Sequence, residues 1–116
     1  MNKENYLEDS TISIVDKKLV TKICDILEDA KTEQIKTIDI SNKSSCANTF
    51  IIGTCRSSRH ADATADELIL KLKKMGINCP SPEGRPKCDW VLIDAGSIVI
   101  HLFRPDIREH YNLEKL

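Results

Sequence analysis

The sequence predicts a single α/β domain of the α+β type, in which a mixed sheet of four or five strands is flanked by helices. Its 116 residues, 41% of them hydrophobic and 30% charged, supply enough apolar side chains for one core but not for two. The apolar residues follow a helical period in two segments and an alternating or continuous pattern in four others, and a proline marks the start of a third, short helix. The resulting order of helix, strand, strand, helix, strand, strand, helix is typical of a sheet covered by helices.

The N-terminal part of the chain predicts a lead-in, a helix and a strand. Residues 1–12 are polar and lack a sustained period, so we expect a flexible lead-in there and one folded domain over residues 13–116. Apolar side chains at helical spacing from Leu19 to Ala30 indicate a helix of about four turns. The alternation within Ile35–Ile40 predicts a half-buried strand.

A central strand and a long helix are predicted next. Asn48–Thr54 is almost continuously apolar, which is typical of a strand buried on both faces. The helix that follows has one apolar stripe, a serine at position 57 or 58 that can cap its start, and Gly76 suited to its end. Because crossovers through a helix are normally right-handed and join parallel strands, we expect the strands before and after this helix to be parallel.

The C-terminal part predicts a hairpin followed by a short helix. Asn78–Lys87 is rich in proline, so it can contain only a very short edge strand. Trp90–Asp94 and Ser97–Phe103 are expected to form an antiparallel hairpin with its turn at Ala95–Gly96. A short helix is predicted over Asp106–Tyr111, because a proline precedes it and proline is favoured where helices begin.

Composition and charge exclude several classes of protein. Seventeen Lys and Arg against eighteen Asp and Glu leave a net charge of −1. Binding to nucleic acid depends on clustered cations, so direct sequence-specific nucleic-acid binding is not expected. The longest apolar stretch, Trp90–Ile100, is interrupted by Asp94 and is shorter than the roughly 20 residues of a membrane-spanning helix. The N-terminus is polar and acidic, unlike a signal or transit peptide, and a cytoplasmic location is therefore expected.

The residues predict no metal site, cofactor or enzymatic activity. The five cysteines are odd in number and contain no Cys-x-x-Cys pair, so we expect free thiols in a reducing compartment. Asp39 and Asp94 are single carboxylates on separate strands, whereas two-metal phosphoryl transfer needs acidic ligands that converge. The Gly-x-Ser-x-Gly elbow of many hydrolases is absent from the sequence.

The turn before the long helix leaves a nucleotide-binding alternative open. In Gly53–Ser58 a strand leads into a helix, an arrangement that can present backbone amides and serine hydroxyls to an anion. The candidate anion or turn site consists of Ser57, Ser58, Arg59 and His60. A capped turn without any anion has the same appearance, and no Gly-x-x-x-x-Gly-Lys run is present.

Trp90 is the strongest candidate for a protein contact. It is the only tryptophan of the chain, and it opens a strand beside a loop that carries Glu83 and Asp89. Tryptophan is enriched among the residues that dominate protein interfaces, although a tryptophan in the core is the alternative. His101, among aliphatic neighbours in the next strand, is interpreted as a half-buried, hydrogen-bonded histidine.

Several runs, taken in order, resemble the ribosomal silencing factor (Iojap-like) family. Singly these runs are unspecific, but their order and the matching plan of helices and strands are a strong signal over roughly residues 14–116. The runs that carry the resemblance are Lys43–Thr54, Ser57–His60, Pro82–Gly84, Asp89–Phe103 and Arg108–Leu116.

The resemblance implies a translation factor without enzymatic activity, with a nucleotidyltransferase-like fold that lacks the catalytic carboxylates. Family members are expected to bind the large ribosomal subunit through ribosomal protein L-fourteen and to block joining of the small subunit when nutrients are short. Self-association into a homodimer is a further expectation from the family. By position, the resemblance assigns contact with the ribosomal protein to Glu83, Gly84, Trp90, Leu92, Asp94 and Tyr111.

A charge argument agrees with this assignment. Ribosomal proteins are basic, and Glu83, Asp89 and Asp94 would surround the aromatic side chain of Trp90 with negative charge. The competing hypothesis, a nucleotide-binding or nucleotidyltransferase-like enzyme that uses the Gly53–Ser58 turn, predicts instead tight binding of a nucleoside triphosphate.

Overall fold

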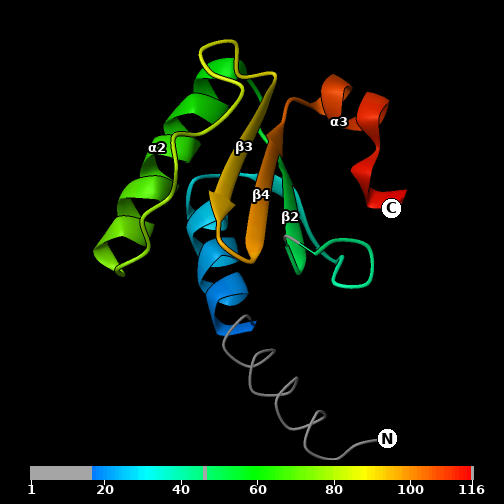
Figure 1. The fold of residues 1–116 in the computed structure, drawn as a ribbon. Coiled ribbons are helices and arrows are strands. Elements are labelled where there is room, and N and C mark those ends of the chain that lie inside the picture. Colours follow the sequence, from blue (N-terminus) through cyan, green and yellow to red (C-terminus); the bar gives the residue numbers. More distant parts are fainter. Residues whose placement is uncertain (1–16, 46, 116) are drawn as a thin grey trace, which may run out of the picture.

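A mixed β-sheet with helices on both of its faces forms the centre of the molecule (Figure 1). The structure is a computed structural model that describes residues 17–45 and 47–115. The predicted lead-in, residues 1–12, lies outside the described residues. The predicted α+β class is confirmed, and the sheet within the described residues has four strands.

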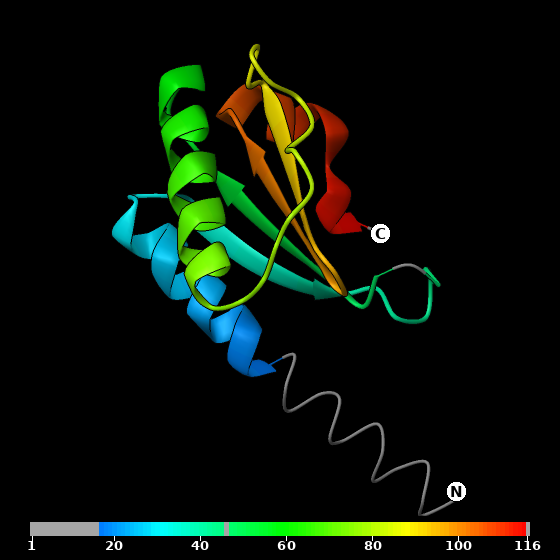
Figure 2. The same ribbon diagram turned by 60° about the vertical axis from the view of Figure 1, so that its left-hand side comes forward.

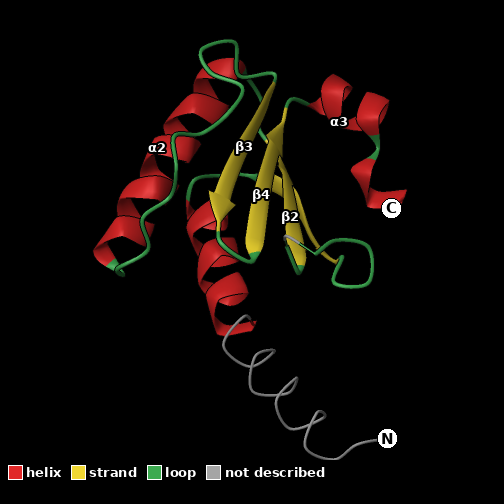
Figure 3. Ribbon diagram, in the orientation of Figure 1, coloured by secondary structure: helices red, strands yellow, loops and turns green. Residues whose placement is uncertain are grey.

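The elements follow the predicted order closely (Figure 3). Residues 17–29 form the described part of the first helix. The remaining elements are β1 (Glu33–Asp39), β2 (Thr49–Thr54), α2 (Ser58–Lys74), β3 (Trp90–Ala95), β4 (Ile98–Phe103), α3 (Pro105–Tyr111) and the short 3-10 helix η1 (Leu113–Lys115).

The order of the strands in the sheet is β1-β2-β4-β3, and it corrects one prediction. β2 is parallel to β4, whereas β3 is antiparallel to β4, so the strands before and after α2 are not parallel as predicted. The reason lies in the segment after α2, which runs back along the helix and returns the chain to the end of the sheet where β2 ends (Figures 1 and 2). The parallel partner of β2 is therefore the second strand of the hairpin.

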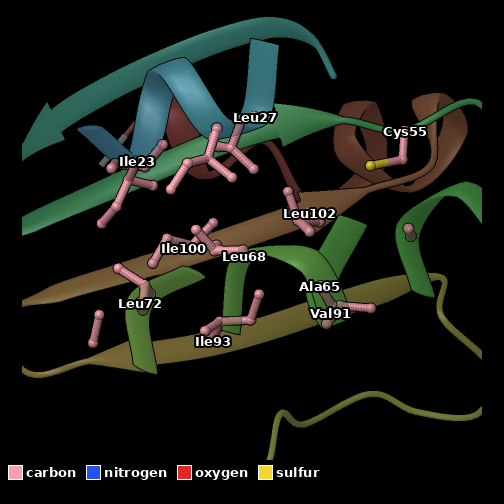
Figure 4. Close-up of a cluster of buried hydrophobic side chains, with 14 of the residues drawn as sticks. Ile23, Leu27, Cys55, Ala65, Leu68, Leu72, Val91, Ile93, Ile100 and Leu102 are labelled. Atoms are coloured by element: carbon pink, nitrogen blue, oxygen red, sulfur yellow. The ribbon is translucent and has the colours of Figure 1, made fainter. Parts of the chain in front are cut away.

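The main core lies between the sheet and the layer formed by the first helix and α2. Ile23 and Leu27 of the first helix, and Leu68 and Leu72 of α2, are completely buried against the central strands (Figure 4). Gly53 lies where β2 passes close to Thr32, and a Cβ atom there would be 2.5 Å from the Thr32 Cγ2 atom. Close packing of the chain explains why this position of β2 is a glycine.

Local signals set the ends of α2 and the turn of the hairpin. Ser57 is the N-cap of α2, and Gly76 has a φ of 86° just beyond its last turn, as predicted. The turn of the hairpin consists of Gly96 and Ser97, one residue later than predicted, because Ala95 still pairs with Ile98. Gly96 has a φ of 79°, a left-handed conformation that glycine adopts without strain.

Candidate protein-binding face of the sheet

The sheet has a second face, opposite the first helix and α2, which we call the open face. Side chains alternate between the two faces of a strand, so the residues between the core positions of each strand point to it. The pairing of the strands places these residues in adjacent rows. The open face carries Lys36, Ile38, Phe50, Ile52, Thr54, Trp90, Leu92, Asp94, Val99, His101 and Phe103.

α3 and η1 cover one end of the open face (Figure 2). Arg108 of α3, itself buried, donates from Nη1 to the Gln34 carbonyl oxygen at 2.6 Å and to the Thr54 hydroxyl at 2.7 Å, and from Nε to Glu114 at 2.7 Å. The Arg108 guanidinium holds the pKa of the Glu114 carboxyl below its usual value. Glu114 also lies 3.5 Å from the Lys36 ammonium. These contacts attach the C-terminal segment to β1 and β2.

Trp90 lies at the boundary between the covered and the uncovered part of the open face. Its ring is 4.7 Å from the ring of Tyr111 and 5.0 Å from that of Phe103, measured between centroids. Its indole Nε1 donates a hydrogen bond to Nδ1 of His101 at 3.0 Å. Trp90 is half-buried, so it belongs to an aromatic cluster on the open face and not to the core beneath the helices.

The uncovered part of the open face is an apolar surface, which we call the open patch. Its residues are all partly or largely exposed apolar side chains, and Tyr111 is 52% exposed. His101 and Ile52 lie buried beneath them. The open patch consists of Ile38, Phe50, Trp90, Leu92, Val99 and Tyr111.

The loop before β3 borders the open patch and contains two of the predicted site residues. Glu83 and Leu92 exchange two backbone hydrogen bonds of 3.0 Å, which pairs the loop with the outer edge of β3. Gly84 has a φ of 97°, and a Cβ atom there would be 1.9 Å from the Trp90 carbonyl oxygen. Gly84 is therefore needed for the close approach of the loop to the backbone of Trp90.

Arg85 anchors the same loop to α2, a contact that sequence reasoning missed. Its guanidinium lies 2.6 Å from Asp62 and 2.7 Å from Asp66, one turn apart on the helix. The two carboxylates raise the pKa of Arg85. No local pattern in the sequence indicates this pairing, because Asp62 and Arg85 are 23 residues apart in the chain.

The charges near Trp90 differ from the expected set of three carboxylates. Asp89 forms ion pairs with Arg104 at 3.1 Å and with Lys87 at 3.4 Å, so its negative charge is compensated locally. Asp94 is exposed and accepts a hydrogen bond from the Gly96 amide at 3.0 Å. Glu83 is exposed on the bordering loop. The negative charge beside the open patch therefore comes mainly from Glu83 and Asp94.

The turn over Gly53–Ser58 forms the internal hydrogen bonds of a helix cap. The Ser57 hydroxyl accepts from the His60 amide at 3.1 Å. His60 Nδ1 accepts from the Arg56 amide at 3.1 Å, and its Nε2 lies 2.6 Å from the Ala30 carbonyl oxygen. Nδ1 of His60 thus closes the turn before α2, and its Nε2 joins the start of α2 to the end of the first helix. This structural role explains the pattern without an anion.

The other residues that could have had catalytic or metal-binding roles do not lie together. Asp39 and Asp94 lie on the two opposite edge strands, and the Asp39 carboxylate accepts from the amide and hydroxyl of Ser41. Within residues 17–45 and 47–115 no group of His, Cys, Asp and Glu could hold a metal ion. The four described cysteines are free thiols whose pKa values are raised by burial, namely Cys24, Cys55, Cys79 and Cys88. None of the described helices has the length and apolar composition needed to cross a membrane.

Comparison with known proteins gives a consistent result. A model of the family described as "Ribosomal silencing factor during starvation" matches residues 13–116. A ribosomal silencing factor of Zymomonas mobilis is 46% identical over 99 residues, which cover 85% of this chain and 72% of that protein. The mouse protein "Mitochondrial assembly of ribosomal large subunit protein 1" is 32% identical over 102 residues, which cover 84% of this chain and 44% of that protein. A crystal structure of a Chromobacterium violaceum protein has a TM-score of 0.81 at 32% identity and covers 85% of this chain and 82% of its own.

The fold and the open face define a small α+β domain whose sheet exposes an apolar surface. Surfaces of this kind are suited to contact with another macromolecule. The chain belongs to the ribosomal silencing factor family, which confirms the resemblance carried by its residues. Members of this family are named as silencing factors, and they are regulators, not enzymes.

Proposed function

We propose that this protein represses translation during starvation by binding the large ribosomal subunit, and that the open patch makes the contact. Membership of the silencing factor family supports action on the ribosome. The name of the mouse relative connects a similar chain with the large subunit. We further propose ribosomal protein L-fourteen as the direct partner, with joining of the small subunit blocked sterically by the bound protein. The cytoplasm remains the expected location.

The observation that carries the proposal is the open patch itself. The first helix and α2 cover most of one face of the sheet, while α3 and η1 cover only one end of the other. Trp90, Phe50 and Leu92 remain partly exposed there, although the sequence uses polar residues on most other surfaces. An apolar centre beside exposed Glu83 and Asp94 is complementary to a basic protein with an apolar contact point.

A pair of matched substitutions tests this contact. Val99 lies in the open patch on β4, opposite Asp94 on β3, so a lysine at position 99 has a favourable neighbour and is expected to leave the fold intact. Leu70 is 54% exposed on α2, in the layer on the other face of the sheet, and provides the control. Val99→Lys places a charge in the proposed interface, whereas Leu70→Lys places the same charge away from it.

The measurement is sedimentation of purified ribosomal subunits through a sucrose gradient, with every fraction probed for the protein. Wild type and Leu70→Lys should migrate with the large subunit and reduce the joined particle. Val99→Lys should remain at the top of the gradient and leave joining unchanged. Circular dichroism and thermal unfolding verify that both variants are folded. Binding by folded Val99→Lys equal to wild type would rule out the open patch as the contact.

Two further measurements distinguish binding to ribosomal protein L-fourteen from self-association into a homodimer. Isolated ribosomal protein L-fourteen, immobilised on a sensor surface, should bind wild type and not Val99→Lys. Analytical ultracentrifugation of the free protein over a range of concentrations shows whether a second copy occupies the open patch. A dimer that Val99→Lys dissociates, together with no binding to L-fourteen, would assign the patch to self-association instead.

A further inference from the structure

His101 lies where an aliphatic side chain would be expected. It occupies the middle of β4, is 3% exposed, and has Leu92 and Ile52 as its pairing partners on the two neighbouring strands. Burial of an imidazole among apolar neighbours is unfavourable unless its nitrogens form hydrogen bonds. The hydrogen bonds of the imidazole should therefore indicate the role of His101.

Only one of the two ring nitrogens of His101 has a partner among the described residues. Nδ1 accepts the hydrogen bond from the Trp90 indole at 3.0 Å. Nε2 is buried and has no partner in this part of the chain. Because Nδ1 accepts, the neutral ring carries its proton on Nε2, and a buried donor without a partner opposes folding. Stability of the sheet alone therefore does not explain a histidine at this position.

The contacts of His101 hold its ring, and thereby the indole, in one orientation. The Phe50 ring meets it edge to face with centroids 4.4 Å apart, and the Phe103 ring lies nearly parallel to it at 6.2 Å. Trp90 is in turn held between this hydrogen bond and the rings of Phe103 and Tyr111. The indole is thus fixed at the border of the open patch.

We propose that His101 is a positioning residue, which fixes the indole of Trp90 in the orientation that contacts the partner of the open patch. This role rests on the proposed function. Holding a large side chain in its bound orientation reduces the entropy lost on binding, and so increases affinity without adding a contact. Burial lowers the pKa of His101 to about 4, so the ring stays neutral and accepts the indole hydrogen bond throughout the neutral range.

Two substitutions separate this role from a purely structural one. His101→Phe keeps a ring of similar size but has no acceptor, and it also removes the unpaired Nε2 donor. His101→Asn keeps an acceptor, its side-chain oxygen, close to the position of Nδ1. A structural role predicts that stability and binding fall together. The positioning role predicts that His101→Phe keeps or gains stability and loses affinity, while His101→Asn retains affinity.

The first readout is the fluorescence of the free protein. Trp90 is the only tryptophan in the sequence, so the emission and its quenching by acrylamide report on this side chain alone. His101→Phe should shift the emission to longer wavelength and increase quenching, and His101→Asn should resemble wild type. Emission and quenching of His101→Phe identical to wild type would overturn the proposal, whether or not the protein binds ribosomes.

The second readout is affinity for purified large subunits. His101→Phe should bind about tenfold more weakly, the effect expected when one hydrogen bond that orients a binding residue is lost, and His101→Asn should differ from wild type by less than about threefold. Equal affinity of His101→Phe and wild type overturns the positioning role. If wild type itself does not bind large subunits, the proposed function is wrong, and the positioning of Trp90 does not serve that contact. The fluorescence measurement still decides whether His101 orients Trp90.

Discussion

Acidification should destabilise this protein through the single buried imidazole of His101. Burial lowers its pKa from 6.5 to about 4 in the folded protein, so the unfolded chain binds this proton more tightly than the folded one. Stability is therefore unaffected through this group well above pH 6.5, decreases as the pH falls through 4, and changes no further well below pH 4. This difference in pKa between the unfolded and folded chain corresponds to roughly 3 kcal/mol of unfolding free energy.

The free energy of unfolding decreases at pH values where unfolding can be measured directly. With these two pKa values the linkage relation gives a loss of about 2 kcal/mol at pH 5 and about 3 kcal/mol at pH 4. Urea unfolding at a series of pH values, followed by circular dichroism, measures the free energy of unfolding. Carboxyl groups also titrate in this range, so the informative quantity is the difference between wild type and His101→Phe, in which the carboxyl groups are the same.

As the pH decreases from 7.5 to 4, the free energy of unfolding of His101→Phe should increase relative to that of wild type. His110, which is exposed on α3, provides the matched control. The difference between wild type and His110→Phe, measured over the same range, shows how much of the effect the loss of an exposed histidine produces, and the difference for His101→Phe should be larger. A pH-independent difference between wild type and His101→Phe would refute the reasoning, because it would mean that the imidazole is protonated equally well in the folded and unfolded chains.

Substitutions at four other positions have defined outcomes. Gly84→Ala combines a positive φ with a clash against the Trp90 carbonyl oxygen and should lower the unfolding free energy by about 3 kcal/mol; a cost near zero in urea unfolding would mean that the loop moves away freely. Arg85→Ala should cost about 1 kcal/mol, since its ion pairs are partly exposed, and should speed hydrogen exchange in the loop before β3. Arg108→Ala should cost about 3 kcal/mol, and Arg108→Lys should not restore it, because an ammonium cannot reproduce the guanidinium fork. Asp94→Asn retains an acceptor for its turn and removes the charge, so association with large subunits should slow and depend less on salt; unchanged stopped-flow rates would exclude Asp94 from the encounter.

Much of the secondary structure could be predicted because its causes are local. The apolar stripe of α2, its Ser57 cap and the positive φ of Gly76 depend on residues within a few positions of one another. The hairpin formed by β3 and β4 was also predicted, with its turn misplaced by one residue. Trp90 was identified as a candidate contact from its residue type and its place beside the loop.

Only part of the candidate site could be predicted, because its contacts join residues that are far apart in the sequence. His101 was expected to be a hydrogen-bonded histidine, but its bond to Trp90 requires the pairing of β3 with β4 in one register. The contacts by which Arg85 and Arg108 attach their segments to the rest of the fold were not predicted from the sequence. Arg108 reaches Gln34, 74 residues earlier in the chain, and nothing near either residue indicates the other.

The sequence by itself determined the α+β class, the family and the positions of most helices and strands, because hydrophobic periodicity, caps and turns act over short stretches of chain. The tertiary structure alone decided that β2 pairs with β4 and that one face of the sheet stays largely uncovered. It also decided which side chains meet at Trp90. These features depend on contacts between distant segments, whose free energy is set by how the whole chain packs and not by any local pattern.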